Sequence, residues 1–371
     1  MKDRLAVWAL GLVLFSAAFI QHRPPPLRSG LLPHEPAPPI SEYECAVEIP
    51  CDPAPIASDP SAPIVSEEGP LRQTRSTVIE VLMQLARMQN ADGSWGRGRT
   101  MLGDQGVNQT GLTGLAVVSF IKEGYSHLSK DDYDDLRFGD VVKKGLKWFL
   151  QNQRDDGTFA GEGNGPVDQF LATWALSEAY GNTATQLFLE PAQRSVDATS
   201  RAFLASLSRG DDSSAIWGGF ALTSARLSEL EIPDGTMEAG LAYFGARLSW
   251  SEQPVTAAGW SILWGSHGAP GLRPAAERAV QQPPDFEQPD LLGWYLKSAA
   301  FERCRGSDRK RAEYWGRRAR ESTSAAWARA KDLQSWNRSE DVVRASLLAF
   351  NLEYRDWPDT ACDCCKSPAG E

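Results

Sequence analysis

The chain has 371 residues, 42% of them hydrophobic and 23% charged, which is enough for one large core or several stacked units. Lysine and arginine number 38 against 48 aspartates and glutamates, so the formal net charge is −10. This balance argues against nucleic acid and against an anionic membrane surface as partners, because both repel a negative protein.

The N-terminus has the pattern of an export signal. Residues 5–20 are apolar and uncharged, and Lys2 and Arg4 precede them. The run is slightly short for a spanning helix, which needs about 20 residues. Ser16-Ala17-Ala18 is an acceptable cleavage site. Residues 1–22 are therefore predicted to be a signal anchor, or a signal peptide if cleaved. The rest of the chain is then extracytoplasmic at the cell membrane, or secreted.

Residues 23–70 are predicted to be an unpacked linker. They hold thirteen of the 24 prolines, and proline fixes φ and removes a hydrogen-bond donor. In an exported protein, the cysteines outside the presumed core are candidates for disulfides, with free thiols or a metal site as alternatives: Cys45, Cys51, Cys362, Cys364 and Cys365. Cys304 is expected to be a buried structural residue.

After residue 70 the chain alternates two kinds of helical segment. Segments with apolar residues at helical spacing and charges on the other face are expected near 72–89, 140–153, 192–207, 235–249, 272–282 and 309–333. More uniformly apolar segments, expected to be buried on nearly every face, lie near 107–124, 168–181, 217–231, 255–267, 289–303 and 340–355.

Six such pairs at a period of roughly 50 residues predict an array of helical hairpins. A closed ring explains why the apolar helices have no solvent-exposed face, since they would form an inner barrel surrounded by an outer barrel of amphipathic helices. The prediction is an all-α fold over residues 71–357, an α/α toroid of about six hairpins with no sheet. Residues 358–371 would form a flexible tail.

The turn after the first helix is repeated sixty-four residues later. The residues Gln89, Asp92, Gly93 and Trp95 of "QNADGSWG" correspond to Gln153, Asp156, Gly157 and Phe159 of "QNQRDDGTFAG". Both stretches resemble the Gln-Trp motif of the terpene cyclase and protein prenyltransferase α/α toroids. The similarity covers roughly 72–357 and is greatest to bacterial prenyltransferase/squalene-oxidase repeat proteins. It implies that the turn stacks the Gln amide on the aromatic ring and ties an outer helix to the next inner one. Repeats three to five have lost the Gln.

The chain contains the Asp-x-Asp-Asp pattern with which cyclases of this kind protonate an alkene: Asp132, Asp134 and Asp135. In those enzymes the acid faces an apolar cavity from an inner helix. Here the pattern lies in a polar stretch beside Lys130 and Arg137. A solvated loop is therefore predicted, and the three aspartates are only weak candidates for catalysis.

No metal or other cofactor is predicted. The prenyltransferases hold zinc with Asp, Cys and His, but Cys304, His127 and His267 lie on separate hairpins, and zinc needs three or four convergent ligands. Residues expected to line the interior of the ring are Gln109, Asp168, Trp174, Trp260, Trp264, Trp294 and Tyr295. Aromatic walls suit an apolar or polyene ligand, unless the rings simply fill the barrel.

Two functions remain open. The favoured one is an envelope-anchored, non-catalytic binding or scaffold module, with an apolar, terpenoid-like ligand or a protein partner. The alternative is a terpenoid cyclase or prenyltransferase-like enzyme that acts in the cavity. A carbohydrate-degrading toroid is a weaker third reading, because such enzymes need two inner carboxylates. Asp168 and Asp290 lie near helix starts, where they are expected to cap.

Overall fold

The computed structural model describes residues 68–159, 163, 165–248, 255–256, 258–259, 290–304, 309–331, 336 and 338–352. The chain divides into two compact units, Met1–Ile64 and Val65–Glu371, and every described residue belongs to the second. The predicted export signal, most of the linker, the tail and all five candidate disulfide cysteines lie outside the described residues.

Ten helices make up most of the described chain and confirm an α-helical fold: α2 (Glu68–Arg87), α3 (Gln109–Lys122), α4 (Phe138–Asn152), α5 (Pro166–Thr183), α6 (Gln186–Arg209), α7 (Asp212–Leu227), α8 (Thr236–Leu248), α11 (Leu291–Cys304), α12 (Arg309–Ala330) and α13 (Ser339–Leu352). Each overlaps a segment predicted from hydrophobic periodicity. The predicted segment 272–282 and most of 255–267 lie outside the described residues.

The expectation of no sheet was wrong in detail. Strands β1 (Thr100–Leu102) and β2 (Gln105–Val107) form one antiparallel hairpin, and β3 (Asp132–Tyr133) and β4 (Leu136–Arg137) form another. Both lie in connections between helices. A connection that folds back on itself satisfies its backbone N–H and C=O groups by pairing them, which explains these short ladders.

Two predicted boundaries also move. Helix α2 begins at Glu68, inside the stretch predicted as linker up to residue 70. Pro70 is no obstacle, because the first turn of a helix has no intrahelical partner for its N–H groups. Helix α7 begins at Asp212 rather than near 217, since the Asp211 side chain accepts a hydrogen bond from Ser214 N–H and caps the first turn.

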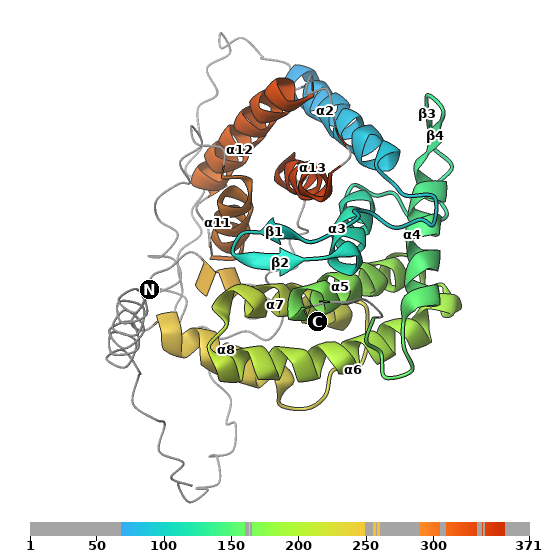
Figure 1. The fold of residues 1–371 in the computed structure, drawn as a ribbon. Helices are drawn as coiled ribbons and strands as arrows, with labels where there is room; N and C mark the ends of the chain where they lie inside the picture. Colours follow the sequence, from blue (N-terminus) through green and yellow to red (C-terminus); the bar gives the residue numbers. More distant parts are fainter. Residues whose placement is uncertain are drawn as a thin grey trace, which may run out of the picture. The chain divides into compact units, whose positions relative to one another are not determined.

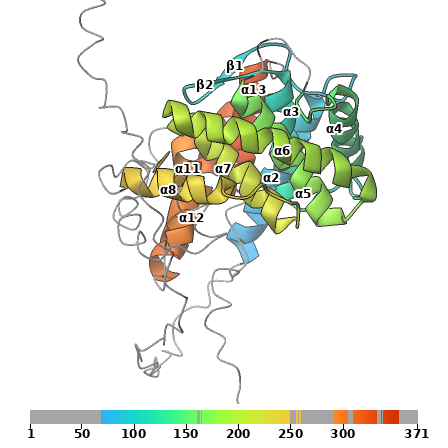
Figure 2. The ribbon, with the colours of Figure 1, turned by 90° about the horizontal axis from the view of Figure 1, so that it is seen from below.

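The apolar helices pack on one another and the amphipathic ones lie outside them. Helix α3 packs against α5 and α13, α5 packs against α7, and α11 packs against α13. Helices α2 and α12 cover α13, while α6 covers α5 and α7 with α8 alongside (Figures 1 and 2). Every residue of α3 from Thr110 to Ile121 is buried, which matches its nearly uncharged sequence.

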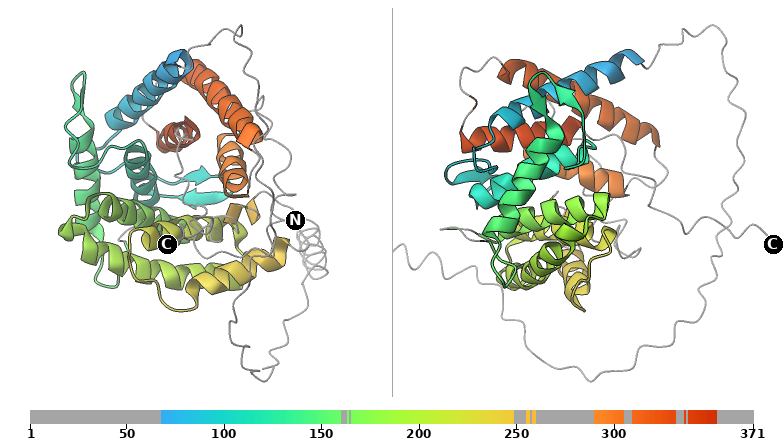
Figure 3. Two further views of the ribbon diagram at one scale, coloured as in Figure 1. Left: turned by 180° about the vertical axis from the view of Figure 1, so that it is seen from behind. Right: turned by 90° about the vertical axis from the view of Figure 1, so that its right-hand side faces the viewer.

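One segment, residues 96–108, contains the β1–β2 hairpin and contacts the first turns of five helices: α3, α5, α7, α11 and α13. These first turns are called the N-terminal rim. The contacts are Asn108 N–H to Asp168 Oδ1 (2.7 Å), Ser213 Oγ to Asp104 Oδ2 (2.9 Å), Ser214 Oγ to Gln105 Oε1 (2.8 Å), Gly103 against Leu292, and Arg97 N–H to Ser339 Oγ (3.2 Å). Leu102 and Val107 are buried beneath the hairpin. The hairpin is seen beside α11 and α13 in Figure 3.

Candidate functional site

The first repeated turn, residues 89–95, is held by four side chains. Asp92 Oδ1 accepts hydrogen bonds from the backbone N–H (3.0 Å) and the hydroxyl (2.6 Å) of Ser94. Trp95 is fully buried, and its ring N–H donates to the carbonyl of Leu85 in α2 at 2.8 Å. Its backbone N–H donates to Thr113 Oγ1 in α3 at 3.0 Å. The turn therefore joins the helix before it to the helix after it.

Gln89 makes a link in addition to the one that the family resemblance implied for the turn. Its amide Nε2 donates to Gly93 O within the turn and to Val141 O in α4, each at 2.9 Å. Helix α4 is the next outer helix, not the next inner one. Gly93 has φ +94° and lies so close to Lys144 that an added Cβ would stand 2.5 Å from its carbonyl oxygen. Only glycine fits this position.

The second turn, residues 153–159, repeats this geometry. Asp156 Oδ1 accepts from Thr158 N–H (2.9 Å) and Oγ1 (2.6 Å), and these bonds hold the pKa of Asp156 below its usual range. Gln153 Nε2 donates to Pro191 O in α6 at 2.8 Å. Gly157, with φ +82°, packs against Arg194 O. Each turn thus docks onto the next outer helix through the same pair of contacts.

A further repeated element was not recognised in the sequence. Gln109 and Thr113 of α3 are matched by Gln169 and Thr173 of α5, sixty residues later. Gln109 Nε2 donates to Ser94 Oγ at 2.7 Å, and Gln169 Nε2 donates to Gly157 O at 3.2 Å. Both glutamines lie on the turn that precedes their helix. Gln109 was expected to line a cavity, but its side chain contacts the preceding turn instead.

Asp168, the other polar residue expected to line the interior, is fully buried at the N-terminal rim. It accepts hydrogen bonds from the N–H groups of Asn108 (2.7 Å), Gly111 (3.0 Å) and Gly165 (2.9 Å). It therefore caps α5 and also binds the start of α3. Asp290 likewise accepts from Gly293 N–H at 2.9 Å at the start of α11, as the capping role predicted.

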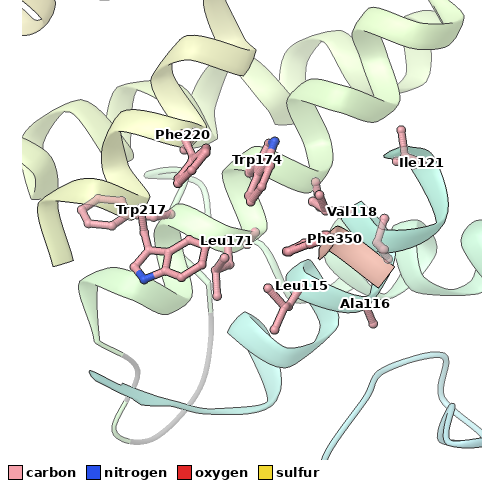
Figure 4. Close-up of a cluster of buried hydrophobic side chains, with 14 of the residues drawn as sticks. Leu115, Ala116, Val118, Ile121, Leu171, Trp174, Trp217, Phe220 and Phe350 are labelled. Atoms are coloured by element: carbon pink, nitrogen blue, oxygen red, sulfur yellow. The ribbon is translucent and has the colours of Figure 1, made fainter. Parts of the chain in front are cut away.

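A cluster of five aromatic rings occupies the space between the apolar helices. Trp174 (α5) stacks on Phe220 (α7) at 5.1 Å, and Phe220 stacks on Tyr295 (α11) at 5.6 Å between ring centroids. Phe350 (α13) contacts Trp174 at 5.6 Å and Tyr295 at 5.2 Å, and Trp217 (α7) completes the group. Figure 4 shows four of these rings beside Leu115 and Leu171. This group is called the aromatic cluster.

Two of the predicted lining residues, Trp174 and Tyr295, belong to the aromatic cluster, where they are 2% and 6% exposed. Trp294 is 1% exposed, and its backbone N–H donates to Asp290 O at 2.9 Å. Trp260 and Trp264 lie outside the described residues. Within the described part of the chain, the predicted aromatic residues are thus packed against protein rather than facing open space.

An ion pair at the edge of the aromatic cluster was not predicted. Lys122 Nζ, at the end of α3, lies 2.9 Å from Glu178 Oε1 near the end of α5, with side chains 21% and 14% exposed. Trp174 Nε1 also donates to Glu178 Oε1 at 3.0 Å. Burial of Glu178 favours its neutral form, but the charge and hydrogen bond of the Lys122 ammonium, together with the hydrogen bond from Trp174, outweigh it, so the pKa of Glu178 lies below its usual range.

The Asp-x-Asp-Asp pattern forms the β3–β4 hairpin outside the helices. Asp132 accepts two hydrogen bonds from the Arg137 guanidinium, at 2.8 and 3.1 Å, which lower its pKa. Asp134 is 71% exposed and lies 3.7 Å from Arg87, while Asp135 is exposed. These carboxylates lie on the solvent-exposed outside of the helices, as the interpretation of a solvated loop expected.

Among the described residues, no group of three or more His, Cys, Asp or Glu side chains is arranged to hold a metal ion. In the same part of the chain, no helix has both the length and the apolarity that crossing a membrane requires. Comparison with known families finds no matching family model, and comparison with curated proteins finds no match.

Proposed function

We propose that residues 71–357 form a non-catalytic α/α toroid that serves as a binding or scaffold module at the cell envelope. The N-terminal segment would anchor it in the membrane, and the Pro-rich linker would hold it away from the surface. The proposed ligand is apolar and terpenoid-like, with a protein partner on the outside of the same module as the other form of binding.

The order of helix contacts supports a closed ring. Helix α13, near the end of the chain, packs against α3, near its beginning, while α3 continues through α5 to α7. The stacking of Phe220 on Tyr295 links α7 to α11, and α11 packs against α13. The repeated docking of Gln89 on α4 and Gln153 on α6 advances the outer layer in the same direction. These contacts run in a cycle.

The observation that carries the non-catalytic reading is the state of the acids. Protonation of an alkene needs a neutral carboxylic acid in a dry site. The hairpin acids Asp132, Asp134 and Asp135 are solvated. Glu178 borders the aromatic cluster but is held as a carboxylate by Lys122. The aromatic rings themselves favour the enzymatic alternative, because they would stabilise a carbocation.

Mass spectrometry of an organic extract of the purified full-length protein tests the proposal. The expected result is an apolar compound, recovered in constant proportion to protein and unchanged after incubation. A matched extract from the Trp174→Ala variant, which removes one wall of the cluster, should contain less of it. Turnover of added squalene or a polyprenyl diphosphate into a cyclic or transferred product would establish the enzymatic alternative instead.

A further inference from the structure

The ends of α3, α5 and α7 form a second rim, opposite the β1–β2 hairpin. These helices start together at the N-terminal rim, and their ends are also joined. Lys122 and Glu178 pair across the ends of α3 and α5, and Ser228 Oγ donates to Ser177 O at 2.9 Å across the ends of α7 and α5. These ends, the connections 123–130, 184–185 and 228–235, and the first two residues of α6, Gln186 and Leu187, are called the C-terminal rim.

Exposed leucines concentrate on this rim. Leu128 follows α3, Leu187 lies in the first turn of α6, and Leu227 ends α7, with exposed fractions of 61%, 64% and 66%. The segments that hold the first two are neighbours, since His127 Nε2 lies 3.3 Å from Thr185 Oγ1. Soluble surfaces seldom gather large apolar side chains without a partner, so the rim has the composition of an interaction site.

A pocket of about 370 Å³ opens beside Leu227, between the end of α7 and the start of α8. Its lining residues are Arg226, Leu230, Ile232, Pro233, Asp234, Gly235, Met237 and Glu238. Leu230 and Met237 are 6% and 3% exposed, so they form an apolar floor. This combination of a floor and an open mouth suits an apolar side chain of a partner.

The connection that forms the pocket is held in place before any partner arrives. Gln193 of α6 donates through Nε2 to Glu231 O at 2.7 Å and accepts from Glu231 N–H at 2.9 Å. A preformed site loses less conformational entropy when it binds. The geometry of the pocket is therefore part of the fold.

The charge around the pocket is negative. The exposed Asp234 and Glu238 line it together with Arg226 of α7, and the exposed Glu229 and Glu231 belong to the connection that forms it. An anionic lipid surface would be repelled by these groups, whereas lysines or arginines beside an apolar side chain would be attracted. The rim therefore selects a cationic and apolar partner.

We propose that the C-terminal rim is a docking surface for a cationic amphipathic helix of a partner protein. The partner places one apolar side chain in the pocket and others over Leu227 and Leu187, with Lys or Arg beside Asp234 and Glu238. Helices dock in grooves through apolar positions at spacings of three and four residues. This inference rests on the binding role proposed above and names the class of partner.

A fluorescein-labelled peptide of about 14 residues, four helical turns of Leu and Lys in amphipathic order, is the probe. Anisotropy measured with the full-length protein should give saturable binding that weakens at least about tenfold between low and high salt. Leu227→Ser and the Asp234→Asn, Glu238→Gln double variant should each weaken binding about tenfold or more. Leu204→Ser, at a 40% exposed leucine in α6 outside this rim, is the matched control and should bind normally.

Three results would overturn the docking proposal: no saturable binding by the wild type, equal binding of a peptide with Glu in place of Lys, or equal loss in the Leu204→Ser control. Sedimentation velocity adds a fourth, a dimer that Leu227→Ser dissociates, because the rim would then bind a second copy. Lipid extraction from the same variants separates the two proposals, since an unchanged extract with no peptide binding refutes only the docking surface.

Discussion

The repeated turns and the β3–β4 hairpin are both rich in aspartate and both connect helices, yet they have opposite surroundings. Asp92 and Asp156 each bind the next residue but one inside a turn that is packed against a further helix. Asp132 and Asp134 project into water, with Arg137 and Arg87 as partners. What differs is the residues around the aspartates. In the turns a glycine directly follows each aspartate and an aromatic ring comes two residues after the glycine, whereas no glycine directly follows an aspartate in the hairpin.

The junction between α6 and α7 is intermediate. It has no Gln and no aromatic residue, but Asp212 still reaches the next outer helix, α8. It pairs with Arg247 Nε at 2.6 Å and accepts a hydrogen bond from the Tyr243 hydroxyl. Arg247 also lies over the Tyr243 ring at 3.6 Å. The α6–α7 junction therefore still contacts the next outer helix, although the Gln and aromatic residue of the first two turns are replaced by Asp212 and its partners.

Trp95→Ala should have the largest effect on stability. The ring is fully buried and its N–H is bonded to Leu85 O, so truncation leaves a cavity and removes a buried hydrogen bond. Chemical denaturation should show a loss of roughly 3–5 kcal/mol in the free energy of unfolding. Met101→Ala, at a 53% exposed residue, is the control. A loss below about 1 kcal/mol would show that the turn is not part of the core.

Gly157→Ala tests the close docking of the second turn. A Cβ there would lie 1.9 Å from Arg194 O in α6, at a φ of +82°. Strain and overpacking together should cost about 2–5 kcal/mol in the free energy of unfolding. Gly210→Ala has a similar φ of +73° but its nearest atom is 3.5 Å away, so it should cost only about 1–2 kcal/mol.

Equal losses for Gly157→Ala and Gly210→Ala would mean that the second turn packs no more closely on its neighbouring helix than the α6–α7 junction, which contains Gly210, packs on α8. Gly235→Ala measures the effect of φ alone, because its φ is +75° and nothing lies within 4 Å of the added atom.

Asp212→Asn should have a smaller effect, about 1 kcal/mol, because the pair with Arg247 is partly exposed and the amide still accepts a hydrogen bond. A double-mutant cycle with Arg247→Met measures the coupling directly. A coupling near zero would show that this contact does not replace the Gln link of the first two turns.

The sequence was sufficient to predict the helices because their apolar spacing is long and regular. It was not sufficient for β1–β2, where only Leu102 and Val107 are buried and the exposed Met101 interrupts any alternation of apolar and polar residues. Glu178 was missed because its partner Lys122 is 56 residues away on another helix, and no spacing rule links them. Gln109 was misplaced because an uncharged helix gave no sign that this residue is its first, facing the preceding turn.

The repeated Gln and Thr of α3 and α5 could have been found. The Gln and Thr repeat after sixty residues, whereas the turns before them repeat after sixty-four. An ungapped alignment of the two units can therefore match the turns or the Gln and Thr, but not both. The difference arises because the β1–β2 hairpin lengthens the first connection. Insertions on a rim are expected in repeat proteins, since each unit contacts only its neighbours through the helices.

The smallest effect is expected in the hairpin, from Asp134→Asn combined with Asp135→Asn. Asp134 has a φ of 53°, a conformation that asparagine also adopts, so the backbone is not strained by the change. Its pair with Arg87 is exposed, and such pairs contribute little. The free energy of unfolding should therefore change by no more than about 0.5 kcal/mol, and the content of the lipid extract should not change. If the pair instead supplied the proton of a cyclisation, the amides could not replace it, and product formation would fall by several powers of ten with the fold intact. That result would overturn the non-catalytic proposal and end the contrast between the two Asp-rich regions.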